Sequence, residues 1–129
     1  MGQTNAWALL IGRCFMALIF IVAGANKIGS YAGTQEYMQA MSVPGAVLPL
    51  VILTELGAGL AICLGLKTRP AAILLAAFSL ISGVIFHHNF ADQVQAIMFM
   101  KNLAMAGGFL ILAATGPGSI SLDKKMQRN

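Results

Sequence analysis

The chain has 129 residues, of which 58% are hydrophobic and only 9% are charged, and its mean hydropathy is +0.81. Soluble domains carry about 25% charged residues, so this composition excludes an ordinary soluble domain and indicates a membrane protein. The net charge is +4, but the sequence contains no stripe of basic residues interleaved with aromatic ones. We therefore expect no nucleic-acid partner. The length allows one domain, residues 1–129, with little chain outside the bilayer.

Four apolar stretches are long enough to cross a bilayer, because a spanning helix needs about 20 apolar residues. They cover residues 7–28, 46–66, 70–88 and 94–115. Backbone polar groups in lipid must be hydrogen-bonded within the segment, so each span should be a helix. The first stretch is too long for a signal peptide, and no Lys or Arg precedes it. The predicted fold is therefore an all-α membrane bundle of four transmembrane helices.

The long connection between the first two spans, residues 27–45, also shows helical spacing. Thr34, Tyr37, Met38 and Met41 fall on one helical face. Tyrosine side chains are enriched where a membrane meets water. These features predict a short interfacial helix over residues 34–41 that caps one end of the bundle.

The distribution of basic residues predicts the orientation of the chain. Cytoplasmic loops of membrane proteins carry an excess of Lys and Arg. The connection after the first span contributes Lys27 alone, and the connection after the third span contributes none. The terminal segments and the middle loop hold the larger group, namely Lys67, Arg69, Lys124, Lys125 and Arg128. We therefore expect both termini in the cytoplasm and residues 27–45 on the outer side.

Three charged residues lie inside the predicted spans: Arg13 in the first, Glu55 in the second and Lys101, beside Asn102, in the fourth. A charge at the bilayer centre costs about 2.5–3.5 kcal/mol, so such residues usually face the bundle interior and pair. Counting about 1.5 Å per residue places Glu55 between the two cations in depth. The sequence thus predicts an Arg13–Glu55–Lys101 cluster. The cluster could fix the helix register only, or it could line a ligand or proton site, and Lys101 could instead extend to the outer surface.

His87 and His88 stand at the outer end of the third predicted span. Adjacent helical residues point about 100° apart, so we expect one histidine at the mouth of the interior site and the other in water. No second ligand follows at i+3 or i+4, and the spacing predicts no metal site.

Cys14 and Cys63 lie in separate spans and form no CxxC motif. Thiols in apolar surroundings usually behave as inert small hydrophobic side chains, and this is the interpretation that the sequence favours.

Small residues recur in the second and fourth spans, where they allow helices to approach closely. This pattern indicates packing within one bundle more than a dimer, although a homo-oligomer stays open. The residues are Gly57, Ala58, Gly59, Ala61, Ala104, Gly107 and Gly108.

Taken together, these motifs closely resemble the DoxX family of small bacterial inner-membrane proteins, and the resemblance covers nearly the whole chain. Each motif is weak alone, but their order and spacing are specific. They are Arg13, GANK at 24–27, YAGT at 31–34, YM at 37–38, PG at 44–45, ELG at 55–57, GLKTR at 65–69, AA at 71–72, FH at 86–87, FMKNL at 99–103 and GPG at 116–118. The YAGT loop is similar to the enterobacterial branch labelled as an oxidoreductase.

The resemblance implies a four-helix inner-membrane protein associated with redox complexes, because the family takes its name from a subunit of a thiosulfate:quinone oxidoreductase. On this basis we expect a quinone or quinol-like molecule in the bundle. Arg13 and Lys101 would polarise its oxygen atoms with help from Asn102, Glu55 would handle protons, and His87 would serve the outer rim. Whether the chain is itself an oxidoreductase or a subunit of one stays open. The alternative is a non-enzymatic scaffold or small carrier for a redox partner protein.

Overall fold

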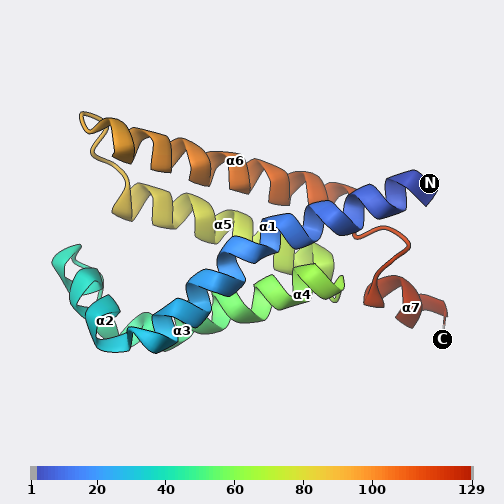
Figure 1. Ribbon diagram of the computed structural model, residues 1–129, viewed down its shortest axis with the longest axis horizontal. Coiled ribbons are helices and arrows are strands. Elements are labelled where there is room, and N and C mark those ends of the chain that lie inside the picture. Colours follow the sequence, from blue (N-terminus) through green and yellow to red (C-terminus); the bar gives the residue numbers. More distant parts are fainter. Residues whose placement is uncertain (1–2, 129) are drawn as a thin grey trace.

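The computed structural model describes residues 3–128, and within this range every regular element is helical (Figure 1). The sequence-based prediction of an all-α fold is confirmed. In chain order the elements are α1 (Gln3–Gly29), α2 (Tyr31–Ala40), the 3₁₀ turn η1 (Gly45–Val47), α3 (Leu48–Leu53), the π-helical turn η2 (Thr54–Ala58), α4 (Gly59–Leu64), α5 (Thr68–Phe86), α6 (Gln93–Thr115) and α7 (Leu122–Arg128).

Four helical stretches are long and apolar enough to cross a membrane: α1, the continuous stretch Gly45–Leu64, α5 and α6. The prediction of four spans is confirmed, with small shifts at the ends. The third span starts two residues before Pro70, because a proline in the first helical turn lacks only an N–H that would be unpaired there. It also ends at Phe86, so His87 and His88 follow the helix instead of closing it.

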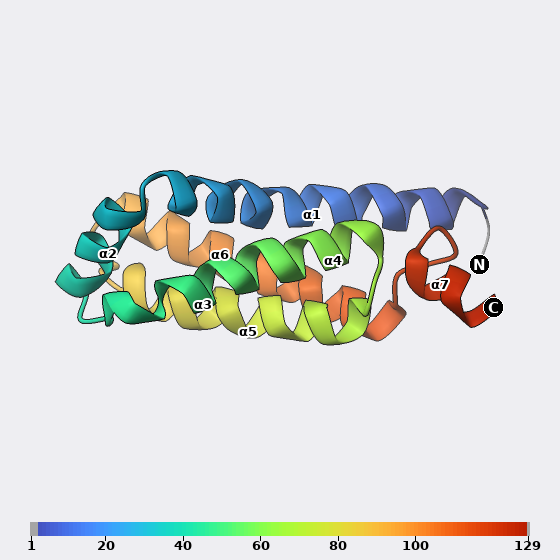
Figure 2. The ribbon, with the colours of Figure 1, turned by 90° about the horizontal axis from the view of Figure 1, so that it is seen from below.

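The spans form an elongated bundle with two distinct ends (Figures 1 and 2). The start of α1 and the whole of α7 lie at one end, which we call the terminal end. Helix α2 lies at the opposite end, the α2 end. Helices α5 and α6 run side by side over their length, and α1 packs against η2 and α4 of the second span.

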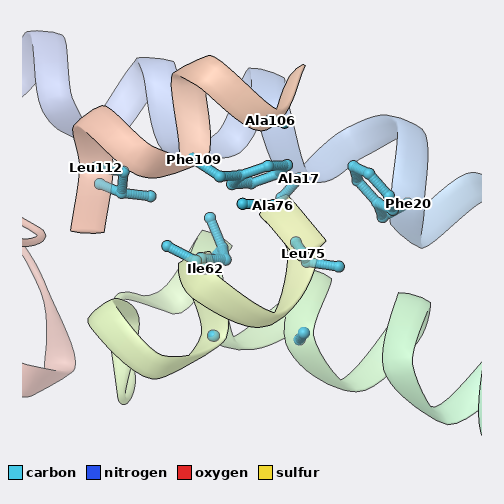
Figure 3. Close-up of a cluster of buried hydrophobic side chains, with 11 residues drawn as sticks. Ala17, Phe20, Ile62, Leu75, Ala76, Ala106, Phe109 and Leu112 are labelled. Carbon is cyan, nitrogen blue, oxygen red and sulfur yellow. The ribbon is translucent and has the colours of Figure 1, made fainter. Parts of the chain in front are cut away.

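A purely apolar cluster fills the middle of the bundle and draws on all four spans (Figure 3). Phe20 of α1 meets Phe109 of α6 edge to face, with 5.5 Å between ring centroids. Ile62 and Leu75 are fully buried beside them. Exposed apolar side chains cover the outside, as lipid contact requires; Phe15, for example, is 75% exposed.

Glycines allow α1 to approach the second span closely. A Cβ added at Gly24 would lie 2.7 Å from Cγ of Leu56, and one added at Gly59 would lie 3.1 Å from Cγ1 of Ile21. Both distances are too short for a side chain without a shift of the neighbour. Close packing of small residues within the bundle, which the sequence indicates, is therefore present at Gly59.

Helix α2 confirms the predicted short helix between the first two spans, although it begins at Tyr31 instead of residue 34. Met38 is buried, and the ring of Tyr37 stacks on Phe86 of α5 at a centroid distance of 5.5 Å. Through these contacts α2 covers the ends of the spans (Figure 2).

Candidate functional site

A cavity of about 370 Å³ lies inside the bundle at the α2 end. All four spans and α2 contribute to its walls. Most of the wall is apolar and includes the rings of Phe20, Tyr37, Phe78 and Phe86. Seven polar side chains also line it: Lys27, Thr34, Glu55, Ser82, His87, Lys101 and Asn102. Mostly apolar walls with a few converging polar groups are typical of small-molecule sites.

Glu55 is the buried acid of this cavity, with 4% of its surface exposed. It lies in η2, where the helix widens to a π turn. Oε1 of Glu55 stands 2.9 Å from Nζ of Lys27 at the end of α1. Single π turns within α-helices are rare and occur frequently at functional sites. The cavity thus has a carboxylate on the second span and an ammonium group on the first.

The predicted Arg13–Glu55–Lys101 cluster is wrong, because the partner of Glu55 is Lys27 and Arg13 lies at the terminal end. The Arg13 guanidinium is 2% exposed. It donates to the carbonyl oxygens of Ile62 (3.1 Å), Cys63 (3.3 Å), Ile120 (3.0 Å) and Pro117. The first two belong to the last turn of α4, where carbonyls lack the N–H partners of the helix interior. The Ile62 oxygen also accepts from the N–H of Gly65 at 3.2 Å. Backbone groups therefore satisfy the buried cation where the sequence predicts an acid.

The sequence-based cluster omitted Lys27, because this residue was counted with the connection 27–45 although the predicted first span, residues 7–28, also contains it. Helix α1 continues to Gly29 and carries Lys27 in its last turn. A signal was present in the spacing. Arg13, Ala17, Phe20 and Gly24 are the buried residues of this face, and Lys27 follows Gly24 at i+3. Helical periodicity therefore places Lys27 on the inward face.

Lys101 and Asn102 of α6 both reach the cavity. Nδ2 of Asn102 donates to the carbonyl oxygen of Ser79 at 3.0 Å and to Oγ of Ser82 at 3.2 Å. These bonds fix the amide against α5. Lys101 is half-buried, and among the described residues no carboxylate lies within the 4.0 Å of an ion pair with it. Its ammonium group is therefore available to a ligand.

The two histidines separate as expected. His87 lines the cavity, and its Nδ1 lies 2.9 Å from Oε1 of Gln95 in α6. His88 is exposed, with Nδ1 3.0 Å from the carbonyl oxygens of Val84 and Ile85. Within residues 3–128 no three His, Cys, Asp or Glu side chains are grouped so that they could hold a metal ion.

The electrostatics of the cavity favour an oxygen-bearing, partly apolar molecule. Two ammonium groups, Lys27 and Lys101, face one carboxylate, Glu55, so the lining carries a surplus positive charge. In surroundings of low dielectric constant such a charge attracts anionic or carbonyl oxygens strongly. The aromatic and aliphatic walls suit a ring and a hydrocarbon chain.

These features define a small multi-pass α-helical membrane protein with an internal cavity at one end. Comparison with known proteins gives the family. The DoxX family matches residues 8–88, which include Arg13, Lys27, Glu55 and His87. The chain belongs to the DoxX family, as the motifs in the sequence indicate.

Two relatives from Escherichia coli (strain K12) match over nearly their whole length. The chain is 53% identical to inner membrane protein YqjF over 120 residues, which cover 93% of this chain and 92% of that protein. It is 42% identical to inner membrane protein YphA over 131 residues, which cover 96% and 94% respectively. No solved structure matches the chain. The protein is thus a multi-pass inner-membrane protein of the DoxX family.

Proposed function

We propose that the protein is a redox-associated membrane subunit whose cavity at the α2 end binds a quinone or quinol-like molecule. The observation that supports this most is the composition of the cavity, where apolar and aromatic walls surround Lys27, Glu55 and Lys101. Quinones carry two ring oxygens and a hydrocarbon chain, and they dissolve in the same bilayer as the bundle. The ring would lie against Phe20 and Phe78.

The polar residues would divide the work by position. Lys101 and Lys27 would donate hydrogen bonds to the quinone oxygens, and the fixed Asn102 amide would limit the orientation of the ring. Glu55 would receive or supply a proton beside those oxygens, and His87 would connect the cavity to the outer rim. Reduction of a quinone takes up two electrons and two protons to give a quinol. The electrons would come from a redox partner protein, and the chain's own residues would hold the ring and move the protons.

Arg13 has no part in this proposal. It does not line the cavity, and its guanidinium donors point to backbone carbonyls at the terminal end. Its burial has a structural explanation, which is the capping of α4 and the docking of residues 117–120.

The test is the binding of a short-chain ubiquinone analogue to detergent-purified protein, measured by equilibrium dialysis against detergent micelles without protein. We expect saturable binding that Lys101→Met weakens about tenfold or more. A hydrogen bond to a charged group contributes about 1.5–3 kcal/mol, and about 1.4 kcal/mol corresponds to a factor of ten. Lys125→Met, on exposed α7, is the control and should bind like wild type. Wild-type protein that binds no quinone would refute the proposal. Recovery of a soluble oxidoreductase from membranes together with empty protein would favour the scaffold alternative.

We also propose that the terminal end faces the cytoplasm and the α2 end faces outward. The support is the concentration of Lys67, Arg69, Lys124 and Lys125 at the terminal end, against Lys27 at the other. Alkaline phosphatase fused after α7 should be inactive, whereas a green fluorescent protein at the same site should fluoresce. The reverse result would refute this orientation.

A further inference from the structure

The only two cysteines of the chain, far apart in sequence, meet at the terminal end. Sγ of Cys14 in α1 lies 3.2 Å from Sγ of Cys63 in α4, and both are free thiols. A disulfide bond is about 2.05 Å long, so the two sulfur atoms would need to approach by about 1.2 Å to form one. We propose that Cys14 and Cys63 form a reversible intramolecular disulfide that ties the first span to the second. This site is separate from the cavity, and it does not depend on quinone binding.

The surroundings hold the two thiols in register. Arg13 precedes Cys14 in α1, and its Nη2 donates to the backbone oxygen of Cys63 at 3.3 Å. The same guanidinium bonds Ile62, so the last turn of α4 is held against α1 at the point where the sulfur atoms meet. The sequence favoured two inert thiols in separate spans. Helix packing instead brings these two residues, 49 positions apart, into contact.

The pair is also within reach of a small oxidant. Cys63 is the residue before the last one of α4, and both thiols are half-buried instead of enclosed. Lipid shields the middle of the spans from polar oxidants. The end of α4, which carries Cys63, lies toward the terminal end of the bundle (Figure 2). We therefore expect a small disulfide from the aqueous phase to reach the pair at Cys63.

The oxidation is a thiol–disulfide exchange with a small-molecule disulfide. One cysteine, as its thiolate, attacks a sulfur atom of the disulfide, forming a mixed disulfide and releasing one thiolate. The second cysteine then attacks the mixed disulfide, the protein disulfide forms, and the second small thiolate leaves. The two protons of the cysteine thiols end on the two small thiols. The protein loses two electrons, and the small disulfide gains them.

The bond would act as a lock on the terminal end. It would close a chain loop of about 49 residues, which restricts the unfolded state, and would hold α4 beside the Arg13 contacts. With the terminal end in the cytoplasm, as proposed above, glutathione and thioredoxin keep the resting thiols reduced. The disulfide would then form when the cytoplasm becomes more oxidising.

The experiment is redox titration of the full chain in detergent with mixtures of reduced and oxidised glutathione, quenched with acid. Remaining thiols are labelled with a maleimide of high mass. We expect both thiols to disappear together, with intact mass showing the loss of two hydrogen atoms and a gel without reductant showing a monomer. Cys14→Ser should keep one thiol that gains a single glutathione. Two stable glutathione adducts on wild-type protein, unreacted thiols throughout, or disulfides only between copies would each overturn the proposal.

A matched control tests geometry against mere thiol content. The variant Cys14→Ser/Leu18→Cys also has two thiols, but Leu18 faces outward and is 58% exposed. It should form no internal disulfide under conditions that oxidise the wild type, and ready closure in this variant would contradict the role of the observed contact. The thermal midpoint of oxidised wild-type protein should rise by several degrees and return on reduction. An unchanged midpoint would overturn the locking role.

Discussion

Nζ of Lys27 lies 2.9 Å from Oε1 of Glu55 and joins the last turn of α1 to the π turn of the second span. The contact places the buried acid of the protein at the α2 end, beside the cavity. The arginine that the sequence offered as its partner lies at the terminal end. Along α1, Ala17 and Phe20 lie between Arg13 and Lys27. Both belong to the apolar cluster drawn in Figure 3.

This pairing predicts strong coupling between substitutions of the two residues. Lys27→Met should lower the free energy of unfolding in detergent by about 1–3 kcal/mol, since it leaves a buried carboxylate without its cation. Glu55→Gln added to Lys27→Met should recover part of that loss. Thermal and denaturant unfolding of the two single variants and the double variant give the coupling energy. The same cycle with Lys125→Met, on exposed α7, serves as the control, and additive effects of Lys27→Met and Glu55→Gln would show that the ion pair does not stabilise the bundle.

Arg13 should hold the C-terminal segment to the bundle. Arg13→Ala removes all of its bonds to backbone carbonyls, so we expect a loss of about 3 kcal/mol or more and faster amide exchange at residues 117–128. Arg13→Lys should recover little, because an ammonium group cannot reproduce the planar set of donors. Hydrogen exchange measured by mass spectrometry gives the local effect. Glu36→Ala, exposed on α2, is the control, and normal protection of 117–128 in Arg13→Ala would contradict this role.

Gly83 should be needed for the position of the Asn102 amide. A Cβ at Gly83 would lie 3.2 Å from both Cβ and Nδ2 of Asn102. We therefore expect Gly83→Ala to lower stability by about 1–3 kcal/mol through overpacking and to disturb the bond to Ser79. Gly107→Ala is the matched control, because nothing lies within 4 Å of its added methyl group and alanine favours a helix. The measurement is the thermal midpoint of each variant in the same detergent, which should be lower for Gly83→Ala than for Gly107→Ala. Equal midpoints would contradict the prediction.

Asp123 should make the docking of the tail depend on pH. Its carboxylate accepts from the backbone N–H groups of Lys67 (2.7 Å) and Thr68 (2.9 Å), and its own N–H donates to the Gly65 carbonyl. Burial alone raises the pKa of Asp123, but the hydrogen bonds from Thr68 and Lys67 outweigh it and hold the pKa below its ordinary value. The unfolded pKa is about 3.9, so the stabilisation is complete above it and is lost as the pH falls through the lower folded pKa.

Amide exchange of residues 119–128, compared from about pH 6 to about pH 3 after correction for intrinsic rates, measures this effect. Asp123→Asn should weaken docking at the higher pH and flatten the profile, since a neutral amide does not titrate. A variant profile as steep as that of the wild type would assign the pH dependence to another group.

Much of the fold could be predicted because it follows from the bilayer itself. Runs of about 20 apolar residues must be helical in lipid, and the four spans and the helix near Tyr37 appear where composition and spacing place them. Boundaries were less predictable. Helix α1 starts at Gln3 instead of residue 7, and α5 stops before His87, because the end turns of a helix depend on its neighbours as much as on its own residues.

The candidate site could be predicted only in part. Glu55, Lys101, Asn102 and His87, all chosen as polar residues in or beside apolar spans, line one cavity. Arg13 does not line the cavity, since backbone carbonyls at the end of a neighbouring helix satisfy its guanidinium. Every residue has a backbone carbonyl, so the residue types in a sequence do not reveal such partners.

The sequence by itself determined that this protein is a four-span membrane bundle with ionisable groups in its interior, because polar groups in lipid are costly and spanning segments must therefore be long apolar runs. The order and spacing of its motifs also identified the DoxX family. Only the tertiary structure decided which groups meet. The pairing of Lys27 with Glu55 and the contact of Cys14 with Cys63 depend on the rotation and relative height of helices, and side-chain packing between spans sets both.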